Sequence, residues 1–222
     1  MNKYAVIFDM DGVICHTNPY HAKAFEAFFK KYNIESNERE FEEHMYGKHN
    51  SYIMQHFFKR PISPKELIDL ESEKEALFRT IYKDEISPIN GYLEFLEELK
   101  SNDFKTGVAT SAPRQNMNLI LDALDIRSKM GSLLCSEDVT LHKPHPEVYL
   151  KSADNLQVDP KNCIVFEDSF SGITAGINAG MTVVAVLSTH TKQQLPPCPA
   201  YINDYTEISV SKILELKKGL DY

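Results

Sequence analysis

The sequence predicts an α/β fold, a Rossmann-like doubly wound parallel sheet with helices on both faces and an inserted all-helical domain. Two observations indicate this fold. Short apolar runs alternate with segments of helical periodicity along most of the 222-residue chain, which is the pattern of repeated strand–helix–strand units. One long stretch after the first apolar run has helical periodicity only, so it interrupts the alternation.

Five apolar runs have the length and composition of buried parallel strands. They are Tyr4–Phe8, Lys105–Thr110, Ser132–Cys135, Cys163–Glu167 and Thr182–Leu187. The core helices that we expect between and after these strands are Gly91–Ser101, Gln115–Leu124, Pro146–Leu156, Ser171–Ala179 and a last one near residues 205–218.

The interrupting stretch runs from about Pro19 to Ser87 and contains no convincing strand. Apolar residues recur in it at helical spacing. Ser63, Pro64 and Glu66 together are typical of a helix start with a capping box. We therefore expect an α/β core formed by residues 1–15 and 87–222, and a helical insertion formed by residues 16–86.

Composition limits the kinds of function. Hydrophobic residues make up 42% and charged residues 25% of the chain, as in globular proteins, and the formal net charge is −8. An acidic surface repels phosphate backbones and anionic lipids, so we expect neither nucleic acid nor membrane as partner. The four cysteines lack metal-site spacing, which favours free thiols. With no signal peptide, membrane segment or marked interface, we expect a cytoplasmic monomer.

The polar residues of interest lie where the strands end. In open parallel sheets, ligands bind beyond the carboxyl ends of the strands. The candidates there are Asp9, Asp11, Thr110, Ser111, Glu167 and Asp168, with Lys143 in a loop before a helix. Four carboxylates in one pocket repel one another, and a hard cation such as Mg²⁺ relieves this repulsion. The cation also lets a carboxylate approach a phosphate, so the set predicts phosphoryl transfer through an aspartyl-phosphate.

Each candidate also has a purely structural interpretation. The Asp9–Gly12 segment suits a turn, and Ser111 could be a helix N-cap. Lys143 could be a solvated lysine, and Glu167 with Asp168 could complement a helix dipole. The common placement of these residues at strand ends or in strand-adjacent loops of one sheet favours the functional interpretation.

At this point the sequence resembles the haloacid dehalogenase superfamily of aspartate-nucleophile phosphotransferases. The segments that carry the resemblance, in order, are Phe8–Val13, Ala109–Ser111, Lys143–Pro146 and Phe166–Ser169 with Gly172. The helical stretch matches the cap domain of that family. Within the family, the chain looks most like the β-phosphoglucomutase group of small phosphatases and mutases.

The resemblance implies a role for each core residue. Asp9 would be the nucleophile and a metal ligand, and Asp11 the general acid/base, with its carbonyl also on the metal. Glu167 and Asp168 would complete the Mg²⁺ site. The residues implied to hold phosphate or line its site are Gly12, Thr110, Ser111, the amide of Ala112, Arg114 and Lys143.

The cap residues implied to contact the substrate are Thr17, His21, Lys23, Gly47, Lys48, Asn50 and Lys74. His21 could instead be a surface residue. Asn50 stands where β-phosphoglucomutases usually carry an arginine that grips a second phosphate, and an amide cannot pair with a dianion. We therefore expect a phosphatase acting on a small phosphorylated metabolite, a sugar phosphate. The alternatives are a phosphosugar mutase and a non-catalytic phospho-accepting or binding module.

Overall fold

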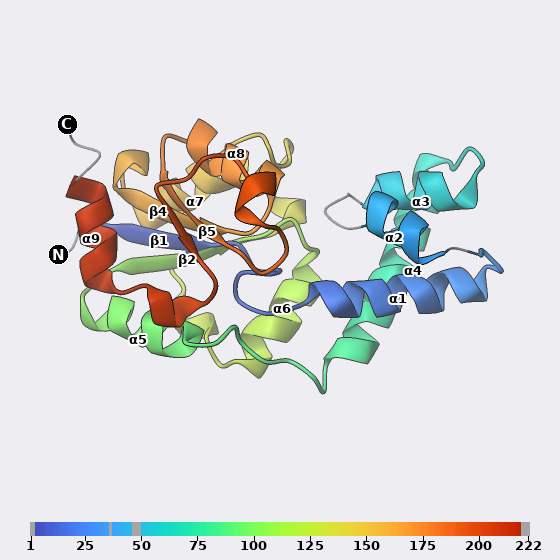
Figure 1. Ribbon diagram of the computed structural model, residues 1–222, viewed down its shortest axis with the longest axis horizontal. Coiled ribbons are helices and arrows are strands. Elements are labelled where there is room, and N and C mark those ends of the chain that lie inside the picture. Colours follow the sequence, from blue (N-terminus) through green and yellow to red (C-terminus); the bar gives the residue numbers. More distant parts are fainter. Residues whose placement is uncertain (1–2, 36, 46–49, 219–222) are drawn as a thin grey trace. The chain divides into compact units, whose positions relative to one another are not determined.

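The structure, a computed structural model, describes residues 3–35, 37–45 and 50–218. The chain divides into two compact units. One consists of Met1–His16 and Ile86–Tyr222, and the other of Thr17–Glu85. The first unit contains a parallel sheet with helices and the second is helical, so the predicted fold class is confirmed (Figure 1).

The sheet of the first unit has six parallel strands in the order β3-β2-β1-β4-β5-β6. They are β1 Ala5–Phe8, β2 Lys105–Ala109, β3 Ser132–Leu134, β4 Cys163–Glu167, β5 Thr182–Val186 and β6 Ala200–Ile202. The five predicted strands are present and end within one residue of their expected bounds. The sixth, β6, was not predicted, because three residues beside a proline-rich segment give no recognisable strand pattern.

Helices cover this sheet. They are α5 Tyr92–Ser101, α6 Arg114–Ala123, α7 Glu147–Leu156, α8 Phe170–Asn178 and α9 Val210–Lys218. Helices α7 and α8 contact each other and the central strands, whereas α5 packs beside α9 (Figure 1). The predicted C-terminal helix near residues 205–218 is present only in its second part. Tyr205–Glu207 forms a short 3₁₀ turn, and the α-helix α9 begins at Val210.

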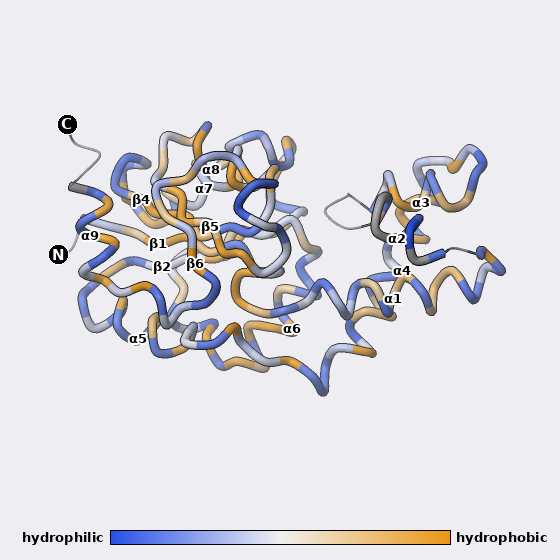
Figure 2. Tube along the Cα trace, in the orientation of Figure 1, coloured by the Kyte–Doolittle hydropathy of each residue, from blue (hydrophilic) through white to orange (hydrophobic). Residues whose placement is uncertain are grey.

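Both faces of the central strands are buried, which explains their continuous apolar runs. Ile7 of β1 lies in one apolar cluster with Tyr149 of α7 and Ile173 of α8. Phe8, the next residue, packs edge-on against Tyr92 of α5, with ring centroids 5.2 Å apart. In Figure 2 the strands β4 and β5 are correspondingly coloured as hydrophobic.

The second unit contains α1 Asn18–Lys31, α2 Glu38–His44, α3 Asn50–Phe58 and α4 Pro64–Tyr82. Its core is largely aromatic, and α1 packs along α4. The predicted start of α4 is confirmed, because the Ser63 hydroxyl accepts a hydrogen bond from the Glu66 amide. Within the described ranges, we find no helix with the length and apolarity that a bilayer crossing requires.

The strand order determines where the functional loops lie. It reverses between β1 and β4, which are hydrogen-bonded neighbours with Phe8 opposite Phe166. Ligands bind in doubly wound sheets at this reversal, beyond the carboxyl ends of the strands. Asp9 directly follows β1, and Glu167 is the last residue of β4.

Candidate active site

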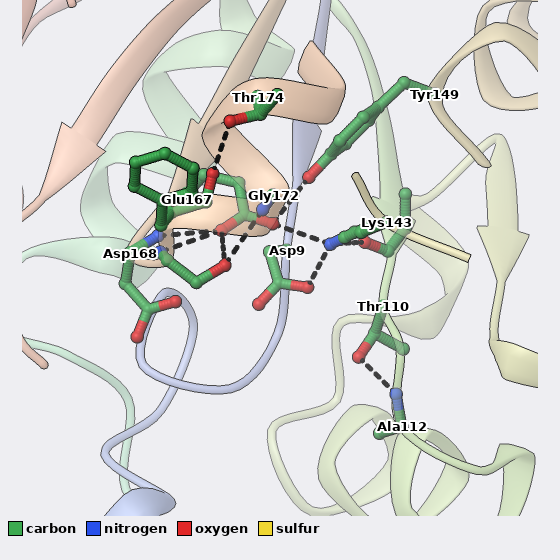
Figure 3. A network of polar contacts seen from close by, with 12 residues as sticks. Asp9, Thr110, Ala112, Lys143, Tyr149, Glu167, Asp168, Gly172 and Thr174 are labelled. Atoms are coloured by element: carbon green, nitrogen blue, oxygen red, sulfur yellow. Dashed lines mark hydrogen bonds and ion pairs between the residues drawn. The ribbon is translucent and has the colours of Figure 1, made fainter. Parts of the chain in front are cut away.

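Three carboxylates meet at the reversal of the strand order. Asp9, Glu167 and Asp168 each place a carboxylate oxygen within 4.8 Å of the others (Figure 3). All three residues are buried. Residues separated by most of the chain therefore form one acidic cluster, as the strand-end argument predicts.

Lys143 lies inside this cluster. Its Nζ atom donates to Asp9 Oδ1 at 2.7 Å, to Glu167 Oε1 at 2.7 Å and to the carbonyl oxygen of Ala109 at 3.0 Å. The ammonium group thus ties together the ends of β1, β2 and β4 (Figure 3). Its structural interpretation as a solvated lysine is wrong, because Lys143 is only 5% exposed.

The carboxylate of Glu167 is hydrogen-bonded at both oxygens. Oε1 accepts from Lys143 and from the Tyr149 hydroxyl at 2.9 Å. Oε2 accepts from the amides of Asp168 and Ser169 and from the Ser169 hydroxyl at 3.0 Å. Five donors fix this carboxylate, so it supports Lys143 and the loop that leads into α8.

Two glycines allow the carboxylates to pack this closely. A Cβ atom on Gly172 would lie 1.6 Å from Glu167 Oε1, so only glycine leaves room for that carboxylate on the first turn of α8. Gly12 has a φ of +72°, and a Cβ atom there would lie 2.1 Å from Asp168 Oδ2. Any other residue at either position would displace part of the cluster.

Burial perturbs the titration of the cluster. Burial raises the pKa of Asp9 to about 7, although the Lys143 charge acts in the opposite direction. The pKa of Asp168 is raised well above its ordinary range by burial and then by the charges of Glu167 and Asp9. Burial alone would lower the pKa of Lys143, but Asp9 and Glu167 hold it well above its usual value. Strongly perturbed pKa values of this kind are typical of functional sites.

Asp11 belongs to the same electrostatic environment. Its charge contributes to raising the pKa of both Asp9 and Asp168. The residue is partly exposed, unlike the three carboxylates of the cluster. The structure thus places Asp11 beside the cluster, where sequence reasoning expected a fourth carboxylate.

The donor set fits a divalent cation. One oxygen of each aspartate is held by the protein, Asp9 Oδ1 by Lys143 and Asp168 Oδ2 by the hydroxyl of Thr189. The second oxygen of each receives no hydrogen bond from any residue that the structure describes. Burial is the main cause of both raised pKa values, and repulsion from the neighbouring carboxylates adds to it. A cation held by these residues would offset that repulsion, and an all-oxygen donor set suits Mg²⁺.

The loop after β2 contains the residues expected to hold phosphate. The Thr110 hydroxyl accepts from the Ala112 amide at 3.0 Å. Ser111 is exposed and has no hydrogen bond with the described residues. It is not the N-cap of α6, since that position is Pro113. The guanidinium of Arg114 binds Asp138 at 2.5 Å, so the structure commits it to a surface ion pair.

In the helical unit, three predicted residues gather around one that was not predicted. Lys74 Nζ lies 2.8 Å from His21 Nδ1 and donates to Glu75 Oε1 at 2.8 Å. Asn50 donates to the same Glu75 oxygen at 2.7 Å. The His21 ring stacks on Phe78 with centroids 3.8 Å apart. Mainly because of Lys74, the pKa of Glu75 falls to about 2 despite burial, which acts in the opposite direction.

The other cap candidates do not join this group in the described interactions. Thr17 is fully buried, and its hydroxyl has no hydrogen-bond partner among the described residues. Lys23 is exposed, with its Nζ 4.9 Å from the centre of the Tyr20 ring. Gly47 and Lys48 lie outside the described residues.

Sequence reasoning missed Tyr149, Thr189 and Glu75. Thr189 follows β5 closely, so the strand-end rule would have found it had the rule been applied to that strand. Tyr149 and Glu75 lie on helices and carry no motif of their own. Only the three-dimensional contact with Glu167 or Lys74 distinguishes them from other helical residues.

The fold and the acidic cluster define an α/β protein with a helical insertion and a buried carboxylate site at the reversal of the strand order. A family model described as haloacid dehalogenase-like hydrolase matches residues 6–186, and the chain belongs to that family. It is an enzyme of the haloacid dehalogenase phosphatase type, related in structure to the β-phosphoglucomutase group.

Individual similarities agree with this assignment. A phosphorylated carbohydrates phosphatase of Thermotoga maritima is 32% identical over 189 residues, covering 80% of this chain and 82% of the relative. A family IA hydrolase from Entamoeba histolytica has a TM-score of 0.91 at 27% identity, covering 97% of this chain and 99% of that one. A β-phosphoglucomutase from Clostridium difficile has a TM-score of 0.84 at 28% identity, covering 99% of both chains.

Proposed function

We propose that this protein is a Mg²⁺-dependent phosphatase that hydrolyses a small phosphorylated metabolite, a sugar phosphate, through a phosphorylated Asp9. One observation carries the proposal. Asp9 has one oxygen held by Lys143 at 2.7 Å, while its other oxygen receives no hydrogen bond from the described residues. A carboxylate that is anchored on one side and open on the other is suited to act as a nucleophile.

In the proposed first step, an oxygen of Asp9 attacks the phosphorus atom and the P–O bond to the sugar breaks. Asp11 gives its proton to the leaving sugar oxygen, which departs as an alcohol. In the second step, Asp11 takes a proton from water, the water oxygen attacks phosphorus, and Asp9 is released with inorganic phosphate. When bound, Mg²⁺ would neutralise negative charge on the carboxylates and the phosphate.

Other side chains would orient these groups. Asp9 and Asp168 would hold the cation, together with the carbonyl of Asp11. Lys143 would keep the Asp9 carboxylate in place and neutralise the transferring phosphoryl group. Because both oxygens of Glu167 are hydrogen-bonded, we assign it to fixing Lys143 rather than to direct ligation.

The loop after β2 would bind the phosphate. The exposed Ser111 hydroxyl is available as a donor, and the Ala112 amide would turn from Thr110 to a phosphate oxygen. Thr110 and Gly12 would shape this site through their backbone. We do not assign Arg114 to the phosphate site, because Asp138 neutralises its guanidinium.

We assign substrate selection to the helical unit Thr17–Glu85, with His21, Asn50 and Lys74 as the candidate contacts. Glu75 supports a phosphatase rather than a mutase, because it neutralises Lys74 and engages the Asn50 amide. This group would have little net positive charge for a second phosphate. A sugar bearing one phosphate fits it better than a bisphosphate.

The similarity to a β-phosphoglucomutase at 28% identity keeps a phosphosugar mutase as the second candidate. A screen of phosphorylated sugars with phosphate detection, run beside glucose-1-phosphate isomerisation, separates the two. We expect free phosphate that requires Mg²⁺ and disappears with chelator. Glucose-6-phosphate without free phosphate would favour the mutase, and no reaction with any phosphate ester would favour a binding module.

A further inference from the structure

Three consecutive side chains that follow β5 contact the loops carrying the acidic cluster. We call this segment, Ser188–His190, the β5 loop. The Ser188 hydroxyl donates to the carbonyl oxygen of Gly12, and the Thr189 hydroxyl donates to Asp168 Oδ2. His190 Nδ1 lies 3.1 Å from the carbonyl oxygen of Asp168. The β5 loop thus joins the segments that follow β1 and β4.

The contact between Thr189 and Asp168 stands out from the others. Asp168 is only 4% exposed, and among the described residues the Thr189 hydroxyl is the sole hydrogen-bond donor to its carboxylate. Glu167 has five such donors, and Asp9 has the Lys143 ammonium. Without Thr189, the Asp168 carboxylate would have no hydrogen-bond donor among the residues that the structure describes.

The packing around this contact selects one carboxylate oxygen. A Cβ atom on Gly12 would lie 2.1 Å from Asp168 Oδ2 and 2.8 Å from Thr189 Oγ1, so the three groups are in mutual contact. Oδ2 is therefore enclosed by Gly12 and Thr189. Oδ1 is left as the oxygen of Asp168 without a protein donor among the described residues.

We propose that Thr189 is a positioning residue that sets the affinity of the site for its divalent cation by presenting Oδ1 of Asp168. It acts through Asp168 and does not touch the reacting atoms. The inference rests on the proposed function, since it requires Asp168 to be a metal ligand. Partners that orient a metal ligand change metal affinity by about 10–100-fold when removed.

The test is a titration of the metal-free full-length chain with Mn²⁺, followed by electron paramagnetic resonance of the free ion. Thr189→Val removes the hydroxyl and keeps the shape, and we expect it to bind Mn²⁺ about 10–100-fold more weakly. Thr189→Ser keeps the hydroxyl and should restore wild-type affinity. Circular dichroism checks that each variant is folded.

Thr106→Val is the matched control. Thr106 is a buried threonine of β2 whose hydroxyl donates to the Lys129 carbonyl at 2.6 Å, outside the acidic cluster. It should lower the melting temperature without changing Mn²⁺ affinity. Wild-type Mn²⁺ affinity in Thr189→Val, or equal weakening in Thr189→Val and Thr106→Val, would overturn the inference. A wild-type chain that binds no Mn²⁺ would instead contradict the proposed function itself.

Discussion

The side chains of Lys143 and Asp9, which are 134 residues apart in the sequence, meet at 2.7 Å between Nζ and Oδ1. The same ammonium lies 2.7 Å from Glu167 Oε1. The buried ammonium of Lys143 therefore holds together the ends of β1 and β4, on which the proposed chemistry depends.

Replacing Lys143 by methionine should damage both stability and catalysis. The change leaves the buried carboxylates of Asp9 and Glu167 without the Lys143 ammonium. Breaking a buried ion pair in this way lowers the free energy of unfolding by about 3–5 kcal/mol. It also removes the positive charge that we propose to neutralise the transferring phosphoryl group, an effect worth about 10²–10³-fold in kcat. Urea denaturation and steady-state kinetics measure the two effects.

Lys151→Met is the control for this experiment. Lys151 forms an ion pair with Glu147 at 2.6 Å on the surface of α7, and such exposed pairs contribute little to stability. Equal losses in the two variants would contradict the central role of Lys143.

Stability of the metal-free protein should depend on Asp9 in a defined pH range. The folded-state pKa of Asp9 is raised by burial from 3.8 to about 7, so the folded state binds more protons than the unfolded state between these values. The free energy of unfolding must therefore fall as pH rises through this window. Asp9→Asn removes this pH dependence. With chelator present, the melting temperature of Asp9→Asn minus that of wild type should therefore rise as the pH increases from 4 to 7. A difference that is independent of pH would show that Asp9 is not titrating as described.

Gly172→Ala should disrupt the acidic cluster by displacing Glu167. The new methyl group would lie 1.6 Å from Glu167 Oε1, so the carboxylate must move and release Lys143 and Tyr149. Overpacking of this kind costs about 1–3 kcal/mol, and we expect phosphatase activity to fall with it. Gly180→Ala has an open position but a φ of +72°, so it should reduce stability through strain while sparing kcat. Thermal denaturation and kcat measurements on both variants decide this, and full activity in Gly172→Ala would contradict the assigned role of Glu167.

Glu75→Gln should change substrate preference. Removing the negative charge leaves Lys74 unneutralised, and the ratio of kcat/KM for a sugar bisphosphate to that for the monophosphate should rise. The control is Glu73→Gln, on the same helix, whose partner is the exposed Lys31 at 2.5 Å. An unchanged ratio in Glu75→Gln would argue against selection by the group around Lys74.

The amino-acid sequence contains enough information to predict the sheet and the acidic cluster, for a physical reason. Buried parallel strands need continuous apolar runs, and parallel strands place their carboxyl ends on one edge. The strand-end rule therefore brings Asp9, Glu167 and Asp168 together on the basis of the residue pattern alone, whereas Lys143 lies in a loop before α7. Strand β6 could not be predicted, because Ala200–Ile202 is too short to show a strand pattern.

The roles of supporting residues could not be predicted in the same way. That both oxygens of Glu167 are hydrogen-bonded depends on Tyr149 of α7 and on the backbone of its own loop. That Arg114 is neutralised depends on Asp138, which follows β3. Such contacts arise from side-chain packing, and neither periodicity nor motif spacing reports them.

The formation of a covalent phosphoryl group on Asp9 is the central claim, and mass spectrometry of the acid-quenched enzyme tests it most directly. The wild-type chain, mixed with a sugar phosphate and Mg²⁺ and quenched during turnover, should yield a peptide containing Asp9 with the added mass of one phosphoryl group. Asp11→Asn, which lacks the base that we propose for the second step, should retain any such group longer, and Asp9→Asn should yield none. Turnover by Asp9→Asn at the wild-type rate would contradict the account.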